Sequence, residues 1–303
     1  MTQQEKVALV QKMQDEILRQ SQRGSWEPVV LYAALGYSRR HADRLFKEFF
    51  DLTPQEYYRR VRLSHSAGAL FDENKSILEV ALDADFSTHE GYTKAFSAAF
   101  GIPPSRYKTG RHPISLFVPY PISTYYNFMA RKDDDSMAEP MLLCTITAVE
   151  RPARRLVFMR SQKATDYFSF CEEVGCDWEG LFNSIPAKFD TAALLTLPPS
   201  LVIPGGSPIA AGVELPADYD GEIPDGCEAA ELPPCILLYF RSQPFTSDEE
   251  FFPLMGAVLR AAEVYDPTLY GYAHAPDSAP RFNFGGQAGK GASVALPVQR
   301  IEK

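Results

Sequence analysis

The chain has 303 residues, of which 45% are hydrophobic, and a formal net charge of −9. This length allows two domains with proper cores, and no stretch approaches the roughly 20 apolar residues that cross a bilayer. The odd number of scattered cysteines argues against a disulfide framework, and a polar N-terminus unlike a signal peptide predicts a cytoplasmic protein with free thiols.

Charge and periodicity both change along the chain. Residues 1–112 contain 16 basic and 14 acidic side chains, whereas the remainder contains 14 basic and 25 acidic ones. Apolar residues recur at helical spacing in 1–112 and alternate as in strands after about 140. We therefore predict a multidomain fold, with an all-α domain at 1–112, a linker at 113–139 and an α+β domain at 140–303. Within the linker, the aromatic stretch 115–129 is expected to pack on one domain and 130–139 to be a flexible hinge.

The second domain contains an internal repeat. The segments "ERPARRLVFMRSQ" (150–162) and "ELPPCILLYFRSQ" (231–243) align without a gap, and a helical pattern follows each, at 164–184 and 247–265. This repeat predicts two pseudo-symmetric α+β halves, with chance similarity between two short strands as the alternative.

The first domain contains two helix-turn-helix outlines. A short helix from Pro28 ends before Gly36, and a second helix is expected from Ser38 to residue 50 with its arginines on the outer face. The outline recurs with helices from Ser76 and from Ser87. A connecting helix begins at a Thr53 cap.

These motifs carry a resemblance to a known family. The order "GYS…H…RLFK…F…TPQEYYRRVRL", followed by "ALDADFSTHEGYTKAFSAAFGIPPSRYK", resembles the AraC/XylS class of bacterial transcription regulators over residues 27–108. The resemblance implies a seven-helix module whose two recognition helices enter adjacent major grooves of DNA, about 34 Å apart.

Position by position, the resemblance implies a set of DNA-contacting residues. They are Ser38, Arg39, Arg40, Asp43, Arg44 and Lys47 in the first recognition helix, and Thr88, His89, Thr93 and Lys94 in the second. Arg44 is the best candidate for a base contact, whereas Arg39 and Arg40 could equally bind phosphate. Asp43 could accept from cytosine or pair with a neighbouring arginine.

The second recognition helix offers fewer cations than the first. Ser87 and Glu90 have capping-box spacing, so Glu90 is expected to be structural. The first unit is therefore expected to dominate binding, aided by a local concentration of positive charge that also includes Lys47, Arg59, Arg60 and Arg62.

The second domain shows a looser resemblance. The duplicated strands, "AAGVELPADYD" and the terminal "ASVALPVQ" are similar to the GyrI-like effector-binding domain, which implies a groove for bulky, often cationic, multidrug-type hydrophobic ligands. Candidate effector-binding residues are Phe168, Trp178, Glu214, Tyr219, Tyr239, Tyr270, Tyr272 and His274. The late strands lack the buried glutamate of cation-binding members, which leaves Glu214 as a substitute. A neutral or anionic effector stays open, with Arg160 and Arg241 as its candidate partners.

No catalytic or metal-binding motif is found. The spacing of "CEEVGC" lacks a second cysteine pair, and "FGGQAGKGAS" lacks the P-loop pattern and favours a flexible loop. We expect a ligand-responsive transcription regulator without enzymatic activity or cofactor, whose partners are double-stranded DNA and a small-molecule effector. RNA polymerase is a further candidate partner, and no membrane is involved. The alternative is a protein that sequesters or hydrolyses small molecules and keeps a vestigial DNA-binding module.

Overall fold

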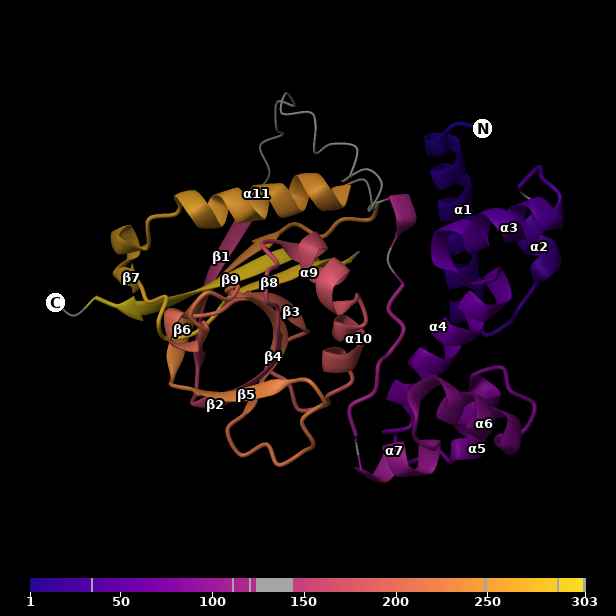
Figure 1. Ribbon diagram of the computed structural model, residues 1–303, viewed down its shortest axis with the longest axis horizontal. Coiled ribbons are helices and arrows are strands. Elements are labelled where there is room, and N and C mark those ends of the chain that lie inside the picture. Colours follow the sequence, from indigo (N-terminus) through magenta and orange to yellow (C-terminus); the bar gives the residue numbers. More distant parts are fainter. Residues whose placement is uncertain are drawn as a thin grey trace. The chain divides into compact units, whose positions relative to one another are not determined.

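The computed structural model of the chain describes residues 1–33, 35–110, 112–119, 121–123, 144–247, 250–287 and 289–301. The chain forms two compact units, Met1–Asp135 and Ser136–Lys303 (Figure 1). The described part of the first unit is helical, and the second unit is built around an antiparallel sheet, as the sequence predicted. Most of the predicted linker, including the expected hinge at 130–139, lies outside the described residues.

Local sequence signals set the ends of the N-terminal helices. The helices are α1 (Gln3–Arg23), α2 (Pro28–Ala33), α3 (Arg39–Phe50), α4 (Pro54–Ala69), α5 (Ile77–Asp83), α6 (His89–Phe100) and α7 (Pro104–Gly110). Thr53 caps α4 in a reciprocal capping box with Glu56, and Pro54 occupies its first turn. Ser76 and Glu79 form the same box at α5. These starts were predicted from the same residues.

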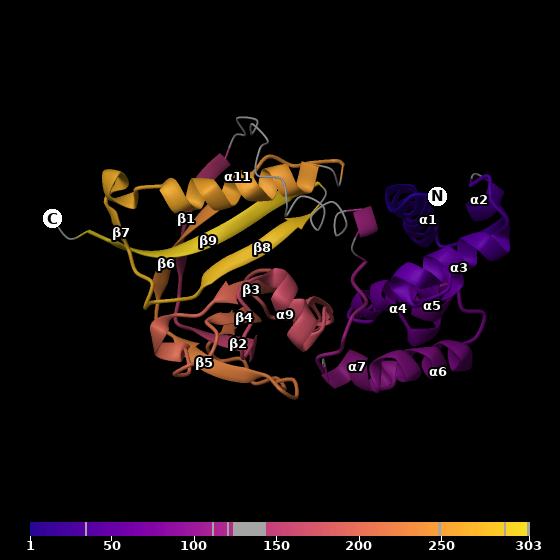
Figure 2. The same ribbon diagram turned by 45° about the horizontal axis from the view of Figure 1, so that its top comes forward.

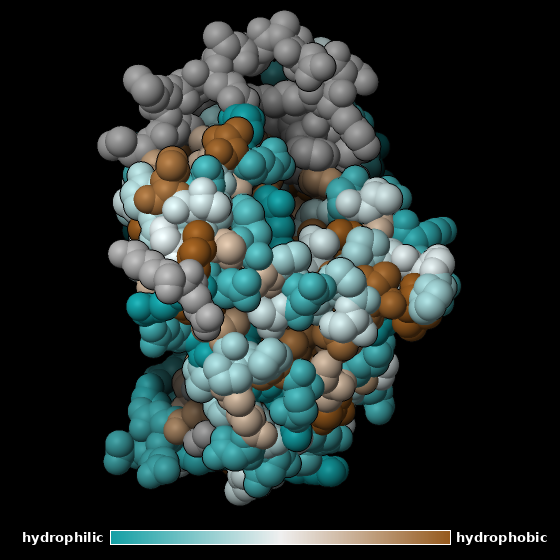
Figure 3. Space-filling model, turned by 90° about the vertical axis from the view of Figure 1, so that its left-hand side faces the viewer, coloured by the Kyte–Doolittle hydropathy of each residue, from teal (hydrophilic) through white to brown (hydrophobic). Residues whose placement is uncertain are grey.

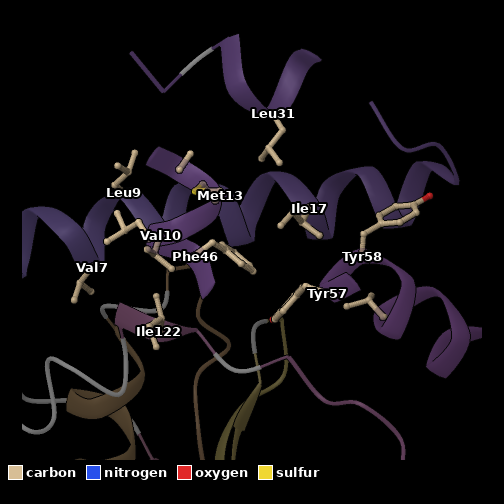
Figure 4. Close-up of a cluster of buried hydrophobic side chains, with 13 residues drawn as sticks. Val7, Leu9, Val10, Met13, Ile17, Leu31, Phe46, Tyr57, Tyr58 and Ile122 are labelled. Atoms are coloured by element: carbon tan, nitrogen blue, oxygen red, sulfur yellow. The ribbon is translucent and has the colours of Figure 1, made fainter. Parts of the chain in front are cut away.

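Two hydrophobic cores lie side by side along α4. Its first half supplies Tyr57 and Val61 to a core with α1, α2 and α3, in which Val10, Met13 and Ile17 of α1 are buried together with Phe46 of α3 (Figure 4). Its second half supplies Leu63 and Ala67 to a core with α5, α6 and α7. Each helix-turn-helix outline therefore has its own core, and α4 joins the two.

Three details of this unit differ from the sequence prediction. Helix α6 is capped by Thr88 instead of Ser87, so Glu90 is not part of a capping box. Ala99 is exposed, although its helical spacing from Tyr92, Ala95 and Phe96 predicts that it shares their apolar face. Arg62 is buried and donates to the Ser21 carbonyl at 2.7 Å, at the end of α1. It therefore satisfies an orphan carbonyl of that helix and adds nothing to the surface charge.

The described part of the aromatic segment after α7 packs on the N-terminal unit. Ile122 is buried in the core of α1, and its backbone N–H donates to Gln14 at 3.1 Å. The N–H of Phe117 donates to Ser64 of α4 at 2.7 Å. The prediction that this segment packs on one domain is confirmed for residues 117–119 and 121–123, because Phe117 and Ile122 are both held by side chains of that unit.

The C-terminal unit has one continuous antiparallel sheet. Its strands are β1 (Cys144–Arg151), β2 (Arg154–Arg160), β3 (Ala193–Thr196), β4 (Ile209–Pro216), β5 (Glu228–Leu232), β6 (Cys235–Ser242), β7 (Tyr272–His274), β8 (Arg281–Gln287) and β9 (Gly291–Arg300). The strand order is β1-β6-β9-β8-β3-β4-β2-β5, with β7 added beside β9. The glycine-rich segment expected to be a loop largely forms the ends of β8 and β9, which pair up to Gln287 and Gly291.

The two faces of this sheet have different neighbours. The outer face is covered by α9 (Tyr167–Val174) and α10 (Trp178–Asn183) over β2 and β4, and by α11 (Phe251–Val264) over β6 and β9 (Figure 2). The sheet curls so that its other face surrounds a common interior, visible end-on in Figure 1. This interior is lined by Leu156, Phe158, Leu195, Leu237, Tyr239 and Phe282, among others.

The end of the C-terminal unit near β7 is mainly hydrophilic, with separate hydrophobic residues among the polar ones (Figure 3). Val264 and Leu269 are exposed large hydrophobic residues of this region. Scattered apolar side chains of this kind are normal on a protein surface. Within the described ranges, none of the helices combines the length and apolar character needed to span a membrane.

Candidate DNA interface and effector site

Helix α3 presents its basic residues on one outer face. Ser38 caps the helix and accepts from the His41 N–H at 3.4 Å, so its hydroxyl is committed to the backbone. Ala42, Leu45 and Phe46 are buried on the inner face. The predicted arginines lie opposite them and are exposed. The helix carries two more basic than acidic residues, which suits a surface that meets phosphate.

The cations of α3 are not equally free. Arg39 pairs with Asp43 at 3.5 Å and lies over the Tyr32 ring, 5.4 Å from its centroid. Asp43 also accepts a hydrogen bond from the Tyr32 hydroxyl, and burial, reinforced by this carboxylate, raises the pKa of that tyrosine. Within the described residues, Arg40 and Lys47 have no ion-pair partner. Asp43 thus makes the arginine pair that was one of its two predicted roles, and this pair restrains Arg39.

Arg44 lies against another side chain of its own helix. One of its terminal nitrogens is 3.4 Å from Nδ1 of His41, whose ring stacks on Tyr37 at 5.2 Å. This contact is weak and exposed, so it orients the guanidinium group without burying it. Arg44 therefore remains available at the middle of the exposed face.

Helix α6 has a weaker electrostatic surface. His89, Glu90 and Lys94 are exposed, so one acidic side chain opposes one lysine. The Thr88 hydroxyl accepts from the Gly91 N–H at 3.0 Å, and a Cβ atom on Gly91 would lie 3.0 Å from that same oxygen. The cap therefore explains why residue 91 is a glycine, because a side chain there would crowd the capping hydroxyl. Thr93 is partly buried, and its hydroxyl has no hydrogen-bond partner.

The interior of the C-terminal unit contains a cluster of charged residues, here called the Arg151 cluster: Arg151, Arg154, Asp190, Glu214 and Tyr239. Glu214 alternates along β4 with Val213 and Leu215, which pack beneath α9 and α10, so its side chain points to the interior. Arg154 is fully buried and forms an ion pair with Glu214. Burial raises the pKa of the Glu214 carboxyl, and Arg154 opposes that shift.

Arg151 completes the cluster at the end of β1. Its guanidinium group pairs with Asp190, donates to the Tyr239 hydroxyl at 2.6 Å, and lies 3.6 Å from Glu214. Burial raises the pKa of the Tyr239 hydroxyl, which donates to Asp190 at 2.5 Å. A small crevice beside the cluster is lined by Asp190, Gly212, Glu214, Phe282 and Phe284, and it has no room for a ligand.

The structure separates the predicted effector-binding residues into three places. Glu214 and Tyr239 meet in the interior. Phe168, Trp178 and Tyr219 lie on the outer side, where Trp178 is buried in the core beneath α9 and α10. Tyr270, Tyr272 and His274 lie at β7 and the turn before it, at an edge of the sheet. Of the eight predicted residues, only Glu214 and Tyr239 belong to the interior cluster.

Arg160 and Arg241, the candidate partners for an anionic effector, already interact with other side chains. Arg160 forms an ion pair with Glu228 at 2.9 Å, and the Arg241 guanidinium group lies over the Tyr239 ring at 4.7 Å.

Sequence reasoning missed the other members of the interior site. Arg151 and Arg154 stand in the repeated segment "ERPARR", so the strand pattern offered a signal for both. Asp190 and Phe284 come from a loop and from a late strand, and nothing in the sequence relates them to Glu214. Within the described residues, no three histidine, cysteine or acidic side chains are grouped so that they could hold a metal ion.

Residues 31–110 match the family model described as "Helix-turn-helix domain". The chain is 37% identical over 73 residues to the probable transcription factor PqrA of Proteus vulgaris, covering 24% of this chain and 60% of that protein. It is 32% identical over 87 residues to the transcriptional activator AarP of Providencia stuartii, covering 28% of this chain and 64% of AarP. Residues 31–110 of the N-terminal unit therefore contain a helix-turn-helix domain.

These relatives match about a quarter of the chain, and the family model spans the segment that includes α3 and α6. The chain spans less than two thirds of the length of either relative, so their whole activities do not transfer with the match. A solved AraC-type regulator from Chromobacterium violaceum is 23% identical and covers 32% of this chain and 92% of that one, with a TM-score of 0.29 that is too low to indicate a shared fold.

Proposed function

We propose that this protein is a ligand-responsive, sequence-specific DNA-binding transcription regulator. Helices α3 and α6 would enter adjacent major grooves. An effector would occupy the interior of the C-terminal unit, where side chains that close the small crevice would have to move to admit it. The observation that carries the DNA-binding part is the exposed basic face of α3 within a helix-turn-helix domain. Arg44 is assigned to base recognition and Arg40 to phosphate.

The two recognition helices are proposed to contribute unequally. Ser38 and Thr88 cap their helices, so the hydroxyl of each already accepts a backbone hydrogen bond. A contact with DNA would have to be made in addition to that bond. Lys94 and His89 are the polar groups of α6 best exposed for contact. Since α3 has four basic residues and α6 has one lysine, most of the phosphate affinity is assigned to α3.

The C-terminal unit is proposed to be a GyrI-like domain with two pseudo-symmetric halves. The strand order supports this proposal, since exchanging β1 with β5, β2 with β6, β3 with β8 and β4 with β9 reproduces it in reverse. A helix or helix pair follows β2 and β6 at equivalent points. Glu214 and Tyr239 then come from opposite halves, which supports an effector site in the interior between them.

The test is a selection of DNA duplexes from a random pool by the full-length protein. We expect a recurrent sequence to be enriched, and Arg44→Ala to reduce affinity for it more than for a random duplex. Effector response is tested with a compound library, in which a true effector changes DNA affinity by about 5–150-fold. Failure to enrich any sequence, with the protein folded, would refute the proposal.

A further inference from the structure

The Arg151 guanidinium group occupies a site with the features of a receptor for an organic cation. Two aromatic rings face it, with its central carbon 5.3 Å from the Phe189 centroid and 5.6 Å from the Tyr239 centroid. Two carboxylates, those of Asp190 and Glu214, pair with the same group. Aromatic faces combined with carboxylates recognise cations in binding sites generally.

The groups that form this site come from three separate parts of the C-terminal unit. Tyr239 comes from β6 and Glu214 from β4, and both are buried. The Phe189–Asp190 segment is fixed to β4, because the Phe189 N–H donates to the Glu214 carbonyl at 3.0 Å. The side chain of Asp190 is 31% exposed, against 12% for Arg151. The site therefore opens to solvent beside Asp190.

The fit of Arg151 in this site is close but incomplete. Its Nε atom is buried without a hydrogen-bond partner, because the nearest carboxylate oxygen of Glu214 lies 3.6 Å away. Glu214 receives its direct hydrogen bond from Arg154 instead. The carboxylates would remain after Arg151 was removed, and Arg154 would balance only one of them.

We propose that Arg151 is an internal ligand that fills the cation site of the C-terminal unit and makes the unit reject free organic cations. Removing its side chain opens a site for a planar cation of the guanidinium or amidinium class. The effector of the unaltered protein is consequently a molecule without positive charge at this position. This inference deepens the proposed effector site and rests on the interior being that site.

The experiment compares binding of ethylguanidinium and benzamidinium to the full-length protein and to Arg151→Ala, by calorimetry and thermal unfolding at constant ionic strength. We expect no saturable binding to the unaltered protein. The variant should bind at least about tenfold more tightly and show a concentration-dependent rise in melting temperature. Arg155→Ala is the matched control, because Arg155 pairs with Glu231 at 3.1 Å outside the cluster. It should behave as the unaltered protein.

Three results obtained with Arg151→Ala would overturn the proposal. The first is equal binding of these cations by the unaltered protein and by Arg151→Ala. The second is no binding by a folded Arg151→Ala. The third is undiminished binding after Asp190→Asn is added to the variant.

If Arg151→Ala does not fold, restored folding with millimolar ethylguanidinium supports the proposal. In that case Arg151→Met, which keeps an apolar stem without charge, is measured in the same way. Lack of saturable binding by the folded methionine variant would also overturn it. None of these readouts uses DNA, so failure here would leave the DNA-binding proposal intact.

Discussion

The restraint of Arg39 by Asp43 can be tested by Asp43→Asn. Asparagine can still accept from the Tyr32 hydroxyl, so the main loss is the charge that pairs with Arg39 at 3.5 Å. An exposed ion pair of this kind is worth about 0.2–1 kcal/mol. Releasing Arg39 should therefore strengthen binding to a random 30-base-pair duplex by up to about fivefold.

The salt dependence of binding separates a new contact from a simple change of charge. If Arg39 gains a phosphate, the plot of log affinity against log salt should steepen by about 0.9. Fluorescence anisotropy between roughly 50 and 200 mM salt measures both quantities. The matched control is Glu48→Gln, which also removes one negative charge from α3 but frees Lys6 instead. Equal changes in affinity and slope for the two variants would refute the reasoning, as would weaker binding by Asp43→Asn.

Four further predictions follow from the geometry. Arg44→Ala should lower affinity for a selected duplex by about 5–150-fold, with a smaller loss on random DNA in the same titration. Burial raises the pKa of Glu179 to about 7 from its usual 4.5, so its contribution to stability is present below pH 4.5 and lost as the pH rises through 7. Urea unfolding should accordingly find Glu179→Gln more stable than the unaltered protein at pH 8, by up to about 3 kcal/mol, and equal to it at pH 4.5. Gly212→Ala should destabilise the C-terminal unit by about 1–3 kcal/mol or more, seen as a lower urea midpoint, because its Cβ would lie 2.4 Å from a backbone oxygen of β2. Thr88→Ala should cost about 1 kcal/mol of local stability, seen as faster amide exchange in α6, whereas Ser87→Ala should leave exchange unchanged.

Much of the N-terminal unit could be predicted from the sequence because its determinants are local. The Ser38, Thr53 and Ser76 caps and the apolar spacing of α3 act within one or two helical turns, and the structure confirms them. The start of α6 was placed one residue early, since Ser87 and Thr88 are adjacent residues with the same capping chemistry. In the structure it is Thr88 that has the extended backbone of a cap residue and accepts from the Gly91 N–H.

The role of a charged side chain was not determined by the sequence. Arg39, Arg40 and Arg62 look alike in a helical pattern, yet one is restrained by Asp43, one is free of ion pairs among the described residues, and one is buried at the end of α1. These differences depend on residues that lie 4 to 41 positions away. Counting charges therefore located the basic segment, but it did not show which of the arginines are available to contact DNA.

The sequence by itself determined the two kinds of unit, the helical module with its turns and the repeated strands that pair into the sheet. Periodicity and capping fix those features over short distances along the chain. Only the tertiary structure decided that Arg151, Asp190, Glu214 and Tyr239 meet, and that Trp178 does not join them. The reason is that strand order brings β1, β4 and β6 around one interior, and the face on which each side chain lies depends on register across the sheet.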